Sequence, residues 1–199
     1  MKKLKLITIY TSALILAFTF SNVSRAEGGL FVEPGVQYES EYTSFNWPAP
    51  YSREDGTLRG FGVGAKIGMH VFDILFAGID ATASRPRYSD NNIDVYATEL
   101  NAGAIVGAQM PVVGLRVWGE FIFASQLDPD VKNGIDTKFS HGLGYKVGAG
   151  FQLFFVSLNL EYQDVTYTKE EINAPIAVIS HDDLNRRGFN IGVSFPMAM

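Results

Sequence analysis

Apolar residues alternate with polar or very small residues along most of the chain that follows residue 26. In Gly60–Val71 every second position is apolar, beginning at Phe61, and the positions between are glycine, lysine or histidine. A period of two is the side-chain period of a β-strand, because successive side chains point to opposite faces. Strands of about 9–11 residues with one apolar face and one polar or small face build membrane β-barrels. The pattern therefore indicates architecture and location before it indicates any chemistry.

Eight segments show this alternation, and each predicts one strand. They are residues 30–42, 58–71, 75–85, 93–109, 115–125, 138–152, 156–164 and 187–195. Tight connections around 72–74, 111–114 and 153–155 alternate with long polar ones at 43–57, 86–92, 126–137 and 165–186. Short turns at one rim and long loops at the other are typical of outer-membrane barrels, and an even strand number closes without a free edge. The sequence thus predicts an all-β, eight-stranded antiparallel up-and-down transmembrane β-barrel.

The same alternation also fits a soluble β-sandwich or a lipocalin-like barrel, in which the apolar face points inward. Two features favour the membrane. Glycine is frequent on the polar faces of 60–68 and 142–150, where small residues leave room for a few long side chains in a narrow lumen. Aromatic residues also gather near the predicted strand ends, as in interfacial girdles. They are Tyr38, Tyr42, Tyr96, Phe123, Phe139 and Tyr162 toward the long loops, and Phe72, Phe76, Phe154 and Phe195 toward the turns.

Residues 1–26 are expected to form a cleavable secretion signal, and residues 27–199 the barrel. A basic start and an apolar stretch around 14–20 precede Ser24-Arg25-Ala26, which places small residues before a cut at Glu27. A membrane-anchoring helix is the alternative, and the short apolar run disfavours it. The signal carries four of the 16 Lys and Arg residues and none of the 21 Asp and Glu residues, so the mature chain is strongly acidic. This balance disfavours a nucleic-acid partner, which requires a basic surface.

The signal, the strand number, the asymmetric rims and the C-terminal segment 188–195 resemble the small OmpA-type, OmpX-type and opacity-type outer-membrane β-barrels. The resemblance covers residues 27–195. In that family the last strand ends on an aromatic residue that the barrel-assembly machinery reads. The matching outward positions here are Phe189, Ile191, Val193 and Phe195, although residues 196–199 follow them.

What the resemblance implies concerns location and partners. It implies a place in the bacterial outer membrane, in contact with outer-membrane lipid and lipopolysaccharide. It also implies assembly by the barrel-assembly machinery and an extracellular ligand bound through the loops.

Charged residues on the polar faces predict an ionic network inside the barrel. An unpaired charge in a confined lumen is costly, so acidic and basic side chains are expected to meet there. Across the first tight turn Lys66 is expected opposite Asp80, and across the turn at 153–155 Lys146 is expected opposite Glu161. The full set is Glu33, Lys66, Asp80, Glu99, Arg116, Glu120, Lys146 and Glu161. Such a set forms either a plug or a gated ion path, and the narrow bore of eight strands favours a plug.

Other motifs carry little chemistry. The glycine runs lack the helix and the Lys-Ser/Thr ending of a phosphate-binding loop. Ser140 and His141 alternate to opposite faces, which disfavours the Ser–His pair of a lipid-modifying enzyme. The acidic segment 180–183 fits a solvated loop better than a cation site. No catalytic residue, metal ligand or cofactor is therefore expected.

The leading hypothesis is a non-enzymatic outer-membrane barrel with a polar, plugged lumen. Its surface loops would serve adhesion, interaction or envelope integrity. The alternatives are a narrow channel for ions or small solutes and an enzyme that modifies lipid A.

Overall fold

A computed structural model describes residues 29–46, 54–72, 74–90, 94–110, 112–131, 136–173 and 183–198. The expected secretion signal lies outside the described residues, and so do positions 180–182 of the acidic loop segment. In the described ranges no helix is long and apolar enough to cross a bilayer.

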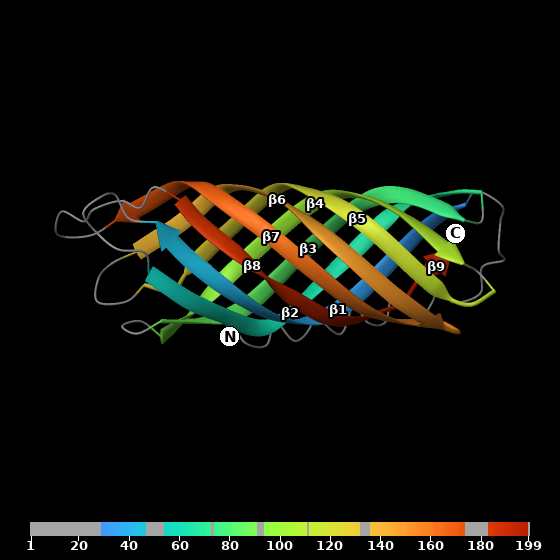
Figure 1. The fold of residues 1–199 in the computed structure, drawn as a ribbon, viewed down its shortest axis with the longest axis horizontal. Coiled ribbons are helices and arrows are strands. Elements are labelled where there is room, and N and C mark those ends of the chain that lie inside the picture. Colours follow the sequence, from blue (N-terminus) through green and yellow to red (C-terminus); the bar gives the residue numbers. More distant parts are fainter. Residues whose placement is uncertain are drawn as a thin grey trace, which may run out of the picture.

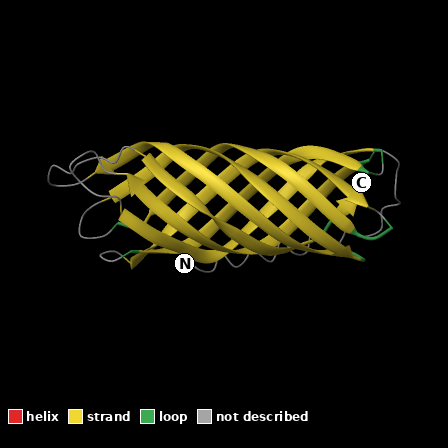
Figure 2. Cartoon of the chain, viewed as in Figure 1, coloured by secondary structure: helices red, strands yellow, loops and turns green. Residues whose placement is uncertain are grey.

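Antiparallel strands wind around one axis and close into a barrel (Figures 1 and 2). Each strand pairs with its neighbours in sequence, and β1 pairs with β8 to close the wall. The predicted eight-stranded, antiparallel up-and-down barrel is confirmed. The strands are β1 Leu30–Asn46, β2 Glu54–Val71, β3 Leu75–Ser89, β4 Asp94–Met110, β5 Leu115–Pro129, β6 Asp136–Leu153, β7 Val156–Asn173 and β8 Asp183–Ser194, with a short β9 at Met197–Ala198.

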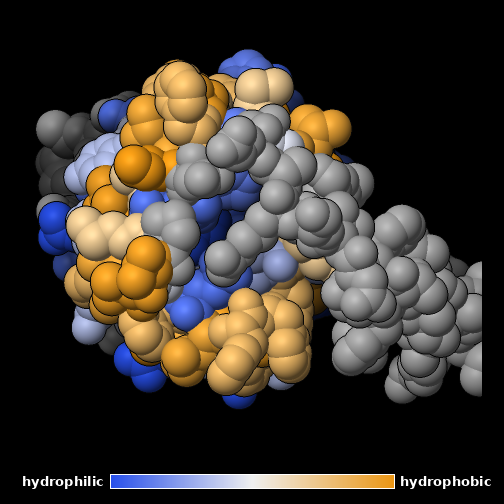
Figure 3. Space-filling model, turned by 90° about the vertical axis from the view of Figure 1, so that its right-hand side faces the viewer, coloured by the Kyte–Doolittle hydropathy of each residue, from blue (hydrophilic) through white to orange (hydrophobic). Residues whose placement is uncertain are grey.

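The apolar faces of the strands point outward, which decides between the two barrel types that the sequence left open. Phe61 is 73% exposed and Ile67 56% exposed, whereas Asp80 and Lys146 are each 1% exposed. Figure 3 looks into the short-turn end and shows an apolar outer wall around a hydrophilic bore. A soluble barrel has the opposite arrangement, whereas a barrel in lipid requires this one.

The strands run further toward the long loops than predicted. β7 continues to Asn173, nine residues beyond the expected end at 164, and β8 begins at Asp183. Past the apolar belt the outward positions are polar, as at Arg85 and Arg87 on β3. Hydrophobic alternation fades there because the outward positions are polar and the inward ones mix apolar and charged residues, as Leu184 and Arg186 do on β8. The backbone ladder nevertheless continues. Inward-facing residues in these extensions, above all Arg186, therefore escaped the sequence prediction.

A bulge interrupts the wall between β5 and β6. The ladder passes from Ile122 opposite Gly144 to Ser125 opposite Gly142, so β5 carries one extra residue. A second irregularity follows before Leu127, and there His141 adopts a positive φ of 55°. β-Bulges re-aim side chains, and here both Ser125 and Leu127 face the interior.

Two of the predicted girdle aromatics lie inside the barrel instead. Phe76 is 2% exposed and Phe139 is 4% exposed. Each occupies a position on the inner face of its strand, beside the turn rim and the loop rim respectively. The girdle prediction was wrong for these two because proximity to a strand end does not specify a face.

The C-terminal segment completes the seam between the first and last strands. After Ser194, the amide of Phe195 donates a hydrogen bond to the carbonyl of Pro34 at 2.9 Å. β9 then resumes pairing with β1, placing Met197 opposite Val32. The residues after Phe195 are thus part of the wall rather than a free tail, and β9 lies at the short-turn end in Figure 1.

We expect the substitution Phe195→Ala to lower the fraction of folded, heat-modifiable barrel on gels, because Phe195 ends the outward apolar row of β8. Phe154→Ala is the matched control, since Phe154 is 93% exposed in a turn. Normal folding of Phe195→Ala, combined with loss of folding when residues 197–199 are removed, would assign the assembly signal to β9.

Candidate functional site in the barrel lumen

The interior is filled by charged side chains from every strand of the barrel. The eight candidates all point into it: seven are at most 5% exposed, and the side chain of Lys66 is 12% exposed. Glycines opposite the bulkiest groups make this possible. A Cβ on Gly148 would lie 2.3 Å from the ring of Trp118, and one on Gly103 would lie 2.3 Å from Glu120 Oε1. The lumen is therefore packed rather than open.

Lys146 is the centre of the middle layer. Its Nζ lies 2.9 Å from Glu120 Oε2, 3.0 Å from Asp80 Oδ2 and 3.9 Å from Glu161 Oε2. These three carboxylates come from β5, β3 and β7, so the ammonium group joins strands on different sides of the bore. Both the ammonium and its nearest carboxylates are almost completely shielded from solvent, where ionic contacts are strong and their loss is costly.

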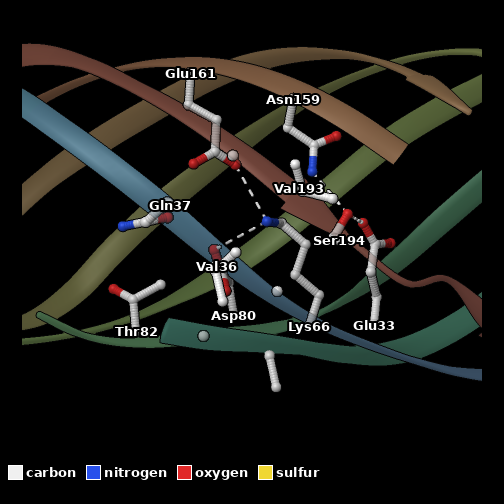
Figure 4. A pocket seen from close by; sticks show the side chains of 14 residues that line it. Glu33, Val36, Gln37, Lys66, Asp80, Thr82, Asn159, Glu161, Val193 and Ser194 are labelled. Carbon is white, nitrogen blue, oxygen red and sulfur yellow. Dashed lines mark hydrogen bonds and ion pairs between the residues drawn. The ribbon is translucent and has the colours of Figure 1, made fainter. Parts of the chain in front are cut away.

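Lys66 links the same layer from β2. Its Nζ lies 3.1 Å from Glu161 Oε1 and 3.6 Å from Asp80 Oδ2 (Figure 4). Trp118 donates its indole N–H to Glu161 Oε1 at 3.1 Å, and the ammonium lies 5.5 Å from the centre of its ring. The middle layer is thus one connected network of two lysines, three carboxylates and an indole.

The predicted register is confirmed for Lys66, which pairs with Asp80 in the β2–β3 ladder. It is wrong for Lys146, which lies opposite Gln163 in the β6–β7 ladder instead of opposite Glu161. The last pair is Leu153 with Val156, and Phe154 takes a positive φ. The turn lies one residue further along the chain than the expected pairing requires, which shifts the register by two residues. Because the shift is even, every side chain keeps its face.

A second ionic layer lies toward the short turns. Arg116 Nη1 contacts Glu33 Oε2 at 2.7 Å, and its guanidinium lies 5.1 Å from the ring centre of Phe76. The hydroxyl of Ser194 donates to Glu33 Oε1 at 2.6 Å. Asn159 in turn donates to Ser194 at 2.7 Å, which ties β7 to this layer.

A third layer lies toward the long loops, and of its charged residues only Glu99 was in the predicted network. Its centre is Arg186, which is 0% exposed and contacts Glu41 Oε2 at 3.0 Å. The same guanidinium forms an ion pair with Glu99 and lies 5.8 Å from the ring centre of Tyr167. A signal was present, because Leu184, Arg186 and Gly188 continue the inward positions of β8.

This third layer contains more acid than base. Glu39 joins Glu41 and Glu99 there and is 0% exposed; it accepts a hydrogen bond from Ser84 at 2.8 Å. Gln163 donates a further hydrogen bond to Glu41. Neutral donors thus supplement the one arginine of this layer.

Apolar side chains close the lumen at both ends of the barrel, on either side of the ionic layers. Near the turns, Phe31, Phe76, Ile105 and Trp118 form a buried cluster. Near the loops, a larger cluster comprises Leu58, Tyr88, Ala97, Ile122, Leu127, Phe139, Val165, Tyr167 and Leu184. Apolar constrictions oppose a continuous water column in a narrow bore.

The cavity between the middle layer and the layer near the short turns is small. It measures about 30 Å³ and is lined by Glu33, Lys66, Glu161 and neighbouring residues (Figure 4). This space suffices for one or two waters. In the described part of the chain, no group of three His, Cys, Asp or Glu residues is arranged to hold a metal ion.

Comparison with known proteins agrees with this architecture. The family model described as the outer membrane protein beta-barrel domain matches residues 12–195. The solved structure of Ail, the attachment invasion locus protein of Yersinia pestis, aligns over 86% of this chain and 100% of its own, with 12% identity and a TM-score of 0.52. The outer membrane protein OprG of Pseudomonas aeruginosa aligns over 89% and 100%, with 12% identity and a TM-score of 0.51. No match was found among curated protein sequences.

We predict that Lys146→Met destabilises the refolded barrel by about 3–5 kcal/mol, because it leaves buried carboxylates without their central cation. The readout is the urea midpoint of unfolding in detergent micelles. Lys169→Met is the control; its ion pair with Glu171 is about half exposed on each side and should contribute little.

Adding Glu120→Gln to Lys146→Met should recover part of the loss, because it removes one stranded carboxylate. Equal midpoints for Lys146→Met and Lys169→Met would show that the lumen is wet.

Proposed function

The chain belongs to the family of outer-membrane protein β-barrel domains, and from this premise we propose that it is a non-conducting, non-enzymatic barrel whose activity lies at its outer surface. It resides in the bacterial outer membrane, in contact with lipid and lipopolysaccharide. The lumen acts as a rigid plug, and the rim that carries the long loops provides the surface for adhesion, interaction or envelope integrity.

The observation that carries the proposal is the position of Lys146. Its ammonium contacts carboxylates from three other strands within 4 Å, at the middle of the bore. A permeating ion would have to separate these contacts, which are shielded from water. Breaking a buried ion pair costs several kcal/mol, about 3–5 when one partner is lost. Ionic layers above and below, each backed by an apolar cluster, add further barriers.

The channel alternative is disfavoured by the same geometry. Conduction requires sites that an ion can both enter and leave. The carboxylates of the middle layer are instead held by the protein's own lysines, and the cavity beside them holds about 30 Å³.

Among the residues that the structure describes, no Ser, His or Asp set is arranged as the enzyme alternative would require. His141 is exposed at the β-bulge, and the neighbouring Ser140 lies opposite Lys169 in the ladder. The inner Ser125 hydroxyl is engaged by Asn101 and Tyr167, at 2.5 and 2.7 Å. A nucleophile needs a free base within hydrogen-bond reach. Ser125 is engaged otherwise, and Lys169, opposite Ser140, forms an ion pair with Glu171.

We expect the barrel, refolded and inserted into planar bilayers, to give no steady ionic current. Insertion is verified by heat modifiability of the same sample. Reproducible single-channel steps that change in Glu161→Ala would contradict the plug.

The same protein expressed in an outer-membrane host should leave the mass spectrum of lipid A unchanged. A new lipid A species that disappears in His141→Ala would contradict the non-enzymatic part of the proposal.

We expect epitope tags inserted after residue 50 or within 174–182 to be accessible on intact cells, because the strands β1, β2, β7 and β8 that flank these connections end at the long-loop rim. A tag at Val112, in a short turn at the opposite rim, is the control and should react only after the outer membrane is permeabilised. The reverse labelling pattern would invert the orientation.

A further inference from the structure

The strands β7, β8, β1 and β2 lie side by side in the wall (Figure 1). A polar recess lies on their outer face, near the ends that meet the long loops. It measures about 340 Å³, which lies within the range of small-molecule sites. The aromatic pair Tyr162 and Phe189, whose ring centres are 5.3 Å apart, lies two residues nearer the short turns on the same strands. The recess therefore opens where the apolar belt ends. There the outward positions become polar, as at Arg85 and Arg87, and form a polar collar near the long loops.

Two rows of outward-facing residues build the recess. Asp164, Arg187 and Tyr42 lie side by side in the ladder of β7, β8 and β1. Asn185, Ser44 and Asp55 form the next row toward the loops, on β8, β1 and β2. Because all of these residues belong to paired strands, the recess is preformed on a rigid wall rather than on a loop.

The chemistry of these side chains fits a hydroxyl-rich ring. Tyr42 is 65% exposed and offers an aromatic face to the C–H groups of such a ring. The carboxylate of Asp164 accepts hydrogen bonds from hydroxyls, and the guanidinium of Arg187 donates them. Thr166 donates to Oδ1 of Asn185 at 2.7 Å and so fixes the orientation of that amide.

Ser44 supplies an independent sign of a ligand. It lines the recess and is 7% exposed, yet its hydroxyl has no hydrogen-bond partner among the described residues. Buried hydroxyls are almost always paired, so the Ser44 hydroxyl is available to a hydrogen-bonding group that enters the recess.

The charge of the recess narrows the ligand class. Asp164 and Arg187, which are neighbours in the β7–β8 ladder, bring one charge of each sign to it. This balance favours a ligand without net charge.

We propose that this recess is a saccharide-binding site. Its ligand is a neutral sugar, carried either by a glycolipid of the outer leaflet or by a free oligosaccharide. The inference deepens the proposed surface role and rests on it. Sugar binding and bilayer current are measured separately, so failure of the site and failure of the plug are distinguishable.

The test uses the refolded barrel in detergent free of lipopolysaccharide. One arm titrates maltotriose, chitotriose and the core oligosaccharide released from lipopolysaccharide. The other compares nanodiscs that contain lipopolysaccharide with nanodiscs that contain phosphatidylglycerol, which is anionic but carries no sugar. Binding in the first arm identifies a free glycan. Preference for lipopolysaccharide without binding of free sugars identifies the glycolipid.

Tyr42→Ala, Asp164→Ala and Ser44→Ala should each weaken binding about five- to tenfold, the effect of losing one hydrogen bond or one stacking contact. Tyr96→Ala is the control, since Tyr96 is 52% exposed on the outer face of β4, away from the recess. Ser44→Ala should also keep the urea midpoint of the free barrel, which separates ligand binding from a structural role. No binding in either arm, or variants that bind as the parent does, would overturn the proposal.

Discussion

Burial of charge in a bore only as wide as its own side chains is the constraint on which this structure depends. Eight strands leave no room for a hydrated ion beside the side chains, so each inward charge must find its partner within the protein. Lys146 meets this requirement with carboxylates from β5, β3 and β7. The same contacts that satisfy the charge also join opposite walls and block the axis. Closure of the lumen is thus a consequence of its electrostatics.

Other features of the fold follow from that requirement. Small residues such as Gly148 and Gly103 stand where Trp118 and Glu120 cross the bore, because a Cβ there would collide with them. The apolar clusters at both ends restrict water from reaching the ionic layers. The outer wall is apolar up to the polar collar, where the strands continue beyond the lipid. The lumen is therefore the rigid part of the molecule, and the collar and its loops are where partners have access.

The sequence was sufficient to predict the barrel because alternation fixes the face of each residue. A register error of two residues leaves that face unchanged. Lys146 illustrates this: its expected cross-strand neighbour was wrong by two positions, yet it still approaches Glu161 to 3.9 Å. Arg186 escaped because it lies beyond the apolar belt, where the outward positions are polar and no longer mark the strand. Phe76 and Phe139 were placed by position along the strand rather than by face. Contacts across the bore, such as Lys146 with Glu120 and Asp80, depend on barrel closure and cannot be obtained from single hairpins.

The most direct test of a dry, paired lumen is the side-chain ammonium signal of Lys146 in the ¹⁵N-labelled, refolded barrel. Ammonium protons in contact with water exchange rapidly at neutral pH, and their signal is lost. The structure predicts a slowly exchanging, observable signal for Lys146 that disappears in Lys146→Met, and none for the half-exposed Lys169. Rapid exchange at Lys146, equal to that at Lys169, would show that water reaches the centre of the bore and would contradict the account.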